Sequence, residues 1–136
     1  DELGGVVWLA QDNIASSIYI PVYCNNTDLP DSYKVKARQT GYSRESAWWA
    51  FNRLGTLAAQ RWGDMHKDID QVWDPMQQQL FNDQEEIEKK ALEMHKKDPQ
   101  QAIEFLTKYT NEWGNKVVNE AWDLGDHLWT KYDEKF

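Results

Sequence analysis

Cysteine is almost absent from this sequence: Cys24 is the only one in 136 residues, so no intramolecular disulfide can form. This usage is typical of a reducing compartment, and we expect a cytoplasmic location. Apolar runs are also short, and none approaches the roughly 20 residues that a membrane-spanning helix needs. Residues 1–5 have neither the basic nor the apolar stretch of a signal peptide, and they contain no initiator Met. We therefore expect no membrane partner and a chain that is a piece of a longer protein.

Basic residues are in the minority, with 15 Lys and Arg against 23 Asp and Glu, which gives a formal net charge of -8. A surface this acidic repels phosphate backbones and anionic lipid headgroups. Nucleic acid is therefore excluded as an expected partner.

The sequence also lacks the spacings that identify catalytic and metal sites. It has no glycine-rich phosphate loop, no Gly-x-Ser-x-Gly elbow and no His-x-x-x-His pair, so we expect no cofactor and no metal. The three histidines are His66, His95 and His127. None lies in a recognisable catalytic context that would activate Cys24 as a nucleophile, and we expect this cysteine to be a small, partly buried residue. A complete thiol hydrolase built on Cys24 is a rival hypothesis.

Residues 5–23 are rich in β-branched and aromatic residues and predict two short strands joined by the turn-prone segment 11–13. Pro21 cannot donate a ladder hydrogen bond, so the second strand should lie at an edge or end near that residue. A hairpin of this size is marginally stable without further strands or a covering layer. The long connector over residues 24–43 suggests an extended segment on a surface. We assign residues 1–42 to a hairpin and connector that complete a sheet of a larger protein.

Residues 43–136 have helical periodicity and predict a layer of three or four long antiparallel helices. Ser46 is the expected N-cap of the first, and Asp74-Pro75 and Asp98-Pro99 predict the starts of two more. A break near Asn82 would make a fourth. The stripe of the last helix is formed by Ala102, Phe105, Leu106, Tyr109, Trp113, Val117, Ala121, Trp122, Leu128, Trp129 and Tyr132. The fold class is therefore α+β, a short β-hairpin followed by helices.

Eight tryptophans are the most unusual part of the composition. Most match the apolar stripes, so we interpret them as packing between helices and not as a binding platform. Trp48 and Trp49 differ, because adjacent helical positions point about 100° apart. One of the two should contact something besides the neighbouring helices, and the sheet is the simplest candidate.

Three segments carry a resemblance to a known family. They are Gly-Val-Val-Trp-Leu-Ala over residues 5–10, Ser-Ile-Tyr-Ile-Pro-Val-Tyr over residues 17–23, and Ser-Ala-Trp-Trp-Ala-Phe over residues 46–51. Together they resemble the C-terminal part of bacterial cysteine-type dipeptidases, which are N-terminal-nucleophile hydrolases related to the secernins. The resemblance covers residues 5–62 and continues more loosely to the end of the chain. It implies that the chain is a fragment of an αββα sandwich.

The resemblance also implies a mechanism, in which an N-terminal cysteine exposed by self-cleavage attacks the peptide carbonyl of a dipeptide. Residue 1 is Asp in this sequence, so the nucleophile is expected upstream and this chain contributes no catalytic residue. Its expected substrate contacts are polar groups at the strand ends, Gln11, Asn13 and Ser17. Turn and strand-capping hydrogen bonds are the structural alternative for each.

The resulting hypothesis is a peptide hydrolase whose dipeptide substrate is bound by the whole protein, while this chain alone is inactive. The expected partners are the rest of that protein and, through the unpaired sheet edge, further copies of this chain. A rival from a different class is a stand-alone, tryptophan-rich helical interaction domain without catalysis.

Overall fold

The computed structural model describes residues 2–136, so the expectation about Asp1 lies outside the described residues. The strands and main helices are β1 (Val6–Leu9), β2 (Ile20–Tyr23), the short α1 (Asp31–Lys34), α2 (Ala47–Ala59), α3 (Trp62–Lys97) and α4 (Pro99–Tyr132). Short 3-10 turns are η1 (Ile14–Ser16), η2 (Arg38–Thr40) and η3 (Asp133–Lys135). One antiparallel hairpin combined with long helices confirms the predicted α+β class.

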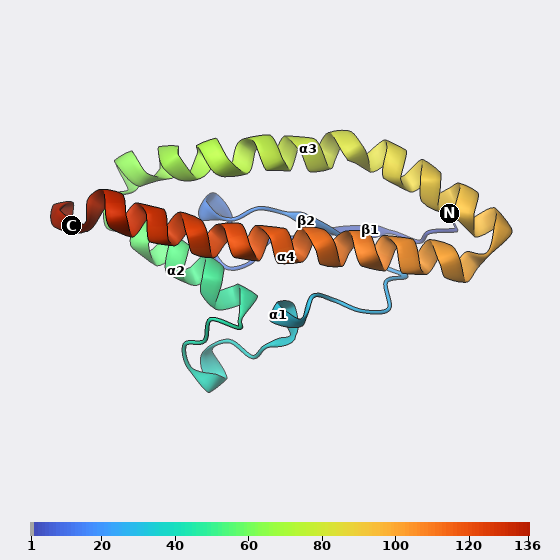
Figure 1. Ribbon diagram of the computed structural model, residues 1–136, viewed down its shortest axis with the longest axis horizontal. Helices are drawn as coiled ribbons and strands as arrows, with labels where there is room; N and C mark the ends of the chain where they lie inside the picture. The colour runs from blue at the N-terminus through green and yellow to red at the C-terminus, as the bar shows by residue number, and fades with distance from the viewer. Residues whose placement is uncertain (1) are drawn as a thin grey trace.

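Two long helices, α3 and α4, run side by side in opposite directions and give the molecule its elongated shape (Figure 1). The shorter α2 packs beside the C-terminal half of α4, and the hairpin lies along α3 and α4. The core lies between these elements, where Leu54, Ile69, Leu80 and Val117 are fully buried. No helix in residues 2–136 is both long enough and apolar enough to cross a membrane.

The two strands pair with Val6 opposite Tyr23 and Leu9 opposite Ile20. Side chains of the hairpin contact α3 directly: the rings of Trp8 and Phe81 are 4.9 Å apart, and the Tyr23 hydroxyl donates to Glu88 Oε1 at 3.2 Å. Burial and then the charge of Glu88 raise the pKa of Tyr23, so this hydroxyl remains a donor. The helices therefore act as the covering layer that the hairpin lacks by itself.

The connection between the strands is longer than the predicted turn at residues 11–13, because β2 begins only at Ile20. The backbone N–H of Tyr19 donates to Gln77 Oε1 at 2.8 Å, and Gln77 Nε2 donates to the Tyr19 carbonyl at 3.1 Å. Since both backbone groups of Tyr19 bond a side chain of α3, this residue does not join the strand ladder. Residues 10–19 form a structured loop, which we call the hairpin loop.

Two of the predicted helix starts are confirmed. Ser46 Oγ accepts from the N–H of Trp49 at 3.3 Å, and Asp98 Oδ1 accepts from the N–H of Gln100 at 3.0 Å, with Pro99 at the first helical position.

The predicted start at Asp74-Pro75 is wrong, because α3 runs without interruption from Trp62 to Lys97, and no break occurs near Asn82. Pro75 cannot donate to the carbonyl of Gln71, but both residues lie on the exposed side of α3, where water can bond that carbonyl. The chain bends instead at Gln60–Arg61, between α2 and α3, which the sequence pattern did not indicate.

The tryptophans follow the packing prediction only in part. Trp73, Trp113 and Trp122 are buried, whereas Trp129, predicted in the stripe of α4, is 57% exposed. Trp49 Nε1 donates to the carbonyl of Ala37 at 3.1 Å, and the Arg38 guanidinium lies 5.2 Å from the Trp48 ring. In these contacts, Trp48 and Trp49 therefore meet the connector, whereas the sheet was the expected partner.

Candidate functional site

The hairpin loop holds the three predicted substrate contacts, Gln11, Asn13 and Ser17. Asn13 is exposed, and its Oδ1 accepts from the N–H of Ala15 at 3.0 Å, so this side chain caps η1. Gln11 and Ser17 are half-buried. Ser17 Oγ is buried and has no hydrogen-bond partner within residues 2–136. The structure thus places the three residues on one loop. Asn13 makes the predicted turn hydrogen bond, and the Ser17 hydroxyl makes no hydrogen bond within the described residues.

The hairpin loop is fixed to the helices at several points besides Gln77. Trp73 Nε1 on α3 donates to the Ser16 carbonyl at 3.0 Å, and Ser16 Oγ donates to the Asn13 carbonyl at 3.3 Å. From α2, Asn52 Nδ2 donates to Asp12 Oδ2 at 3.2 Å. Asp12 itself has φ of 57°, a left-handed conformation that Asp adopts more readily than most residues. Bonds from two helices therefore hold the loop in one conformation.

The chemistry available on the hairpin loop is that of hydrogen bonding. Its polar side chains carry mainly amide and hydroxyl groups. Asp12 is the one residue of this loop whose side chain is charged at neutral pH. Such groups can orient the amide and carbonyl groups of a peptide. They do not include a nucleophile paired with a base.

Cys24 follows β2 and is exposed, which corrects the expectation that it is partly buried. It lines a shallow cleft of about 480 Å³ on the outer face of the hairpin, together with Val7, Val22 and Lys34 among others. Its N–H donates to the Gly5 carbonyl at 2.9 Å, so the residue extends the strand pairing. The neighbouring Tyr23 faces α3 through its bond to Glu88, so the alternation of side chains along the strand places Cys24 on the opposite face of the hairpin.

The neighbours of Cys24 offer no general base. A hydrogen bond from Lys34 holds the pKa of Asp28 below its ordinary value, and the bond to Asp28 raises the pKa of Lys34, so both side chains stay charged at neutral pH. The histidines lie on α3 and α4, and none lines this cleft. No group of three or more His, Cys, Asp or Glu side chains in the described part of the chain has the arrangement of a metal site.

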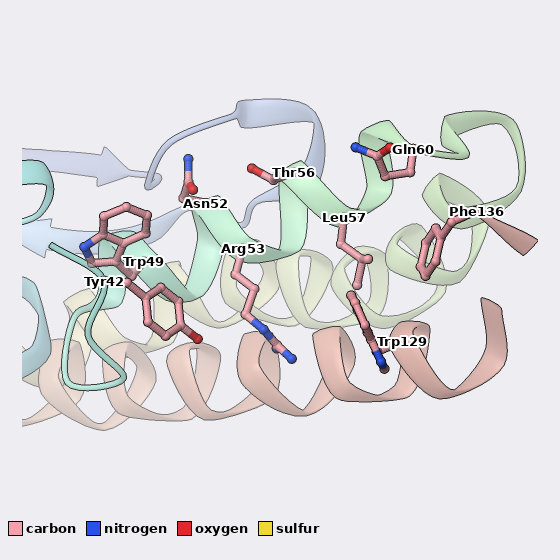
Figure 2. Close-up of a pocket in the computed structure, with 9 residues that line it drawn as sticks. All are labelled: Tyr42, Trp49, Asn52, Arg53, Thr56, Leu57, Gln60, Trp129 and Phe136. Atoms are coloured by element: carbon pink, nitrogen blue, oxygen red, sulfur yellow. The ribbon is translucent and has the colours of Figure 1, made fainter. Parts of the chain in front are cut away.

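A second candidate site is a groove of about 500 Å³ between α2 and the C-terminal end of the chain (Figure 2). It is lined by Tyr42, Trp49, Asn52, Arg53, Thr56, Leu57, Gln60, Trp129 and Phe136. The six residues from α2 and its C-cap are three or four positions apart, so they share one helix face. Figure 2 shows Tyr42 and Trp49 at one end of this face, and Trp129 and Phe136 at the other.

Arg53 in the groove is tied to α4. Its Nη2 donates to Asp126 Oδ1 at 2.6 Å, and its Nη1 donates to the Trp122 carbonyl at 3.4 Å. Arg44 approaches the other carboxylate oxygen of Asp126 at 3.9 Å, and its guanidinium lies 4.3 Å from the Trp122 ring. Two guanidinium groups therefore face one carboxylate beside the groove.

Sequence reasoning missed this groove. The face of α2 is visible in the sequence as the spacing of Trp49, Arg53 and Leu57, but the same spacing is typical of a face that packs in a core. The opposite wall comes from Trp129 and Phe136, more than 70 positions further along the chain. Only the bend at Gln60–Arg61 and the return of α4 bring the two walls together.

Comparison with known proteins identifies a family. Residues 1–75, more than half of the chain, match the sequence model of peptidase family C69. The matched segment includes both strands, the hairpin loop, the connector, α2 and the beginning of α3. No curated protein and no solved structure matches the chain.

Proposed function

The chain belongs to peptidase family C69, and on that premise we propose that it is the supporting C-terminal part of a cysteine-type dipeptidase whose nucleophile lies outside these 136 residues. Family membership identifies a peptide hydrolase. The finer assignment, cleavage of dipeptides by an N-terminal cysteine, follows from the resemblance of residues 5–62 to the cysteine-type dipeptidases. The family match over the hairpin, connector and first helices is the observation that carries the proposal.

The surroundings of Cys24 support a nucleophile located elsewhere. A cysteine nucleophile requires a base or cation that favours the thiolate. Within the described residues, the cleft at Cys24 contains no histidine, and its cation, Lys34, is already paired with the carboxylate of Asp28. In the proposed enzyme, the base is the α-amino group of the catalytic cysteine itself, so no such partner is needed in this chain.

The hairpin has the properties expected of two strands that belong to a larger sheet. In residues 2–136 it is a sheet of two strands. Val7 on β1 is apolar and pairs with Val22, yet it is 56% exposed, as expected if another part of a larger protein covers it. We propose that further strands of the αββα sandwich pair with β1, while α3 and α4 form the covering helical layer. The same arrangement would place the hairpin loop at the end of a sheet.

At that position, the hairpin loop would supply substrate contacts through Gln11, Asn13 and Ser17. The loop is held by α2 and α3, so its polar groups have fixed directions, as substrate-orienting groups require. Ser17 Oγ has no partner in the described residues but is buried, so the more accessible Gln11 and Asn13 are the contacts we favour most. For the whole enzyme, we also propose the cytoplasmic location that the single cysteine favours.

The test is hydrolysis of a panel of dipeptides by this chain and by the longer protein in which we propose that it lies, each before and after thiol alkylation. We expect no turnover by this chain. The longer protein should hydrolyse dipeptides and lose that activity on alkylation.

Cys24→Ala is the control that separates the two thiol hypotheses. In the longer protein, this variant should retain activity within about twofold, because Cys24 has no catalytic role in the proposal. Turnover by the 136-residue chain that both alkylation and Cys24→Ala abolish would overturn the proposal and assign the chemistry to Cys24.

A further inference from the structure

We propose that the groove between α2 and the C-terminal end of the chain binds a ligand that combines an aromatic ring with a carboxylate, such as the C-terminal aromatic residue of a peptide. Its volume of about 500 Å³ falls within the range of roughly 300–1,000 Å³ that is typical of small-ligand sites. The groove lies apart from Gln11, Asn13 and Ser17, although Asn52 in its lining also donates to Asp12 of the hairpin loop.

The aromatic part of the ligand is inferred from the walls of the groove. Tyr42, Trp129 and Phe136 are 55%, 57% and 51% exposed, although large aromatic side chains are usually buried. They form two ring pairs, Tyr42 with Trp49 and Trp129 with Phe136, each with centroids 5.5 Å apart. The pairs lie at opposite ends of the groove (Figure 2). Exposed rings gathered around one concavity favour a planar apolar guest.

The carboxylate is inferred from charge. Arg53 is the only residue of the groove lining with a charged side chain. Its bonds to Asp126 and to the Trp122 carbonyl use two of its five N–H donors, and its side chain is 24% exposed. Since Arg44 also faces Asp126, two guanidinium groups oppose one carboxylate here, in a chain whose net charge is -8. An anionic group would therefore be drawn to this place on an otherwise acidic surface.

The size of the groove favours a small ligand over a protein face. Along α2 it extends from Trp49 to Gln60, about 16 Å at the helical rise of 1.5 Å per residue, which suits a few C-terminal residues of an extended peptide. A stable protein interface uses roughly 20–30 residues on each side.

The test is a titration of the isotope-labelled chain with N-acetyl-L-phenylalanine, followed by the indole N–H signals of its tryptophans in NMR. Only the signals of groove residues Trp49 and Trp129 should shift, and the shifts should saturate. Two probes dissect the ligand: N-acetyl-L-phenylalaninamide lacks the carboxylate, and N-acetyl-L-alanine lacks the ring. We expect each to bind at least about tenfold more weakly, the usual effect of losing one charge-assisted contact or a buried ring.

Two variants and one matched control assign the site. Trp129→Ala should weaken binding of the acid at least about tenfold, whereas Trp62→Ala, which removes another exposed tryptophan outside the groove, should change it less than twofold. Arg53→Gln should weaken binding of the acid and leave that of the amide unchanged. If Arg53→Gln does not fold, the comparison of acid and amide on the unaltered chain decides the role of charge.

Three results would overturn the proposal: no shift of the Trp49 and Trp129 signals up to the solubility limit of the probe, equal affinity for acid and amide, or equal shifts at Trp62. A dimer that Trp129→Ala dissociates in the absence of probe would assign the groove to a second copy and overturn it as well. Because binding is read without turnover, none of these results depends on the proposed peptidase function.

Discussion

Gly55 lies where α2 meets the hairpin loop, and its missing side chain makes room for Ser16. A Cβ at position 55 would lie 2.8 Å from Ser16 Oγ. Ser16 is 1% exposed, and its hydroxyl donates to the Asn13 carbonyl, so it can only move by leaving that bond. The contact explains why a helix former does not occupy this interior position of α2, where glycine costs about 1 kcal/mol relative to alanine.

We therefore predict that Gly55→Ala lowers the free energy of unfolding by about 1–2 kcal/mol, the usual effect of overpacking a buried contact. Urea unfolding followed by tryptophan fluorescence would measure it. Gly63→Ala is the matched control, because a Cβ there meets nothing within 4 Å, and it should be neutral or slightly stabilising. Adding Ser16→Ala to Gly55→Ala should recover part of the loss, since it removes the clashing oxygen. Equal stability of Gly55→Ala and Gly63→Ala would contradict the prediction.

At the scale of single residues, the sequence predicts caps better than it predicts contacts. Ser46 and Asp98 cap helices as expected, because a cap depends on groups within three residues of it. The roles of Gln77 and Gly55 depend on a loop that is far away in the sequence, and nothing local indicates them. Gln11, Asn13 and Ser17 could be placed at the ends of the predicted strands, but their contacts with substrate stay a prediction.

The helix α3 shows where local signals fail at the scale of an element. Asp74-Pro75 and Asp98-Pro99 are the same start signal, yet only the second begins a helix. Trp73 and Leu80, on either side of the first pair, are 4% and 0% exposed in the core. Packing of these residues on both sides of Pro75 holds the helix continuous, and tertiary contacts therefore override the local preference.

This difference predicts opposite responses to the same substitution. Pro75→Ala should raise the free energy of unfolding by about 1–3 kcal/mol, because it restores a helix hydrogen bond to the Gln71 carbonyl and removes the ring clash. Pro99→Ala should be neutral or slightly destabilising, because the first helical position needs no intrahelical donor. Thermal or urea unfolding of both variants would measure this. A helix that starts at Pro75 would make the two variants behave alike, and that outcome would contradict the continuous α3.

On the scale of the whole molecule, the hairpin and the helices depend on each other. The helical layer covers one side of the hairpin through Trp8, Tyr23 and Ile20, as expected for two strands that cannot fold alone. The class and the separate strand and helix segments could be predicted from periodicity, because 2- and 3.6-residue repeats are local. The bend after α2 and the groove it forms could not, because they arise from packing between distant segments.

The free edge of β1 gives the molecule-scale prediction, self-association. In the described part of the chain, β1 pairs with β2 alone, and a strand edge with an exposed Val7 is a template for a strand of another copy. We expect the mass of the 136-residue chain, measured by light scattering, to rise with concentration. Val7→Lys should weaken this association about tenfold or more, because a lysine on an edge strand opposes pairing.

Ile14→Lys is the control for this experiment, since Ile14 is 63% exposed but lies in η1, outside the strands. It introduces the same charge and removes a similar apolar group, so association that depends on the edge should persist. If both variants dissociate equally, general surface hydrophobicity drives association and the edge has no special role. If the unaltered chain is a monomer at every concentration, the edge does not recruit another copy. In the longer protein, where we propose that further strands pair with β1, Val7→Lys should instead impair folding.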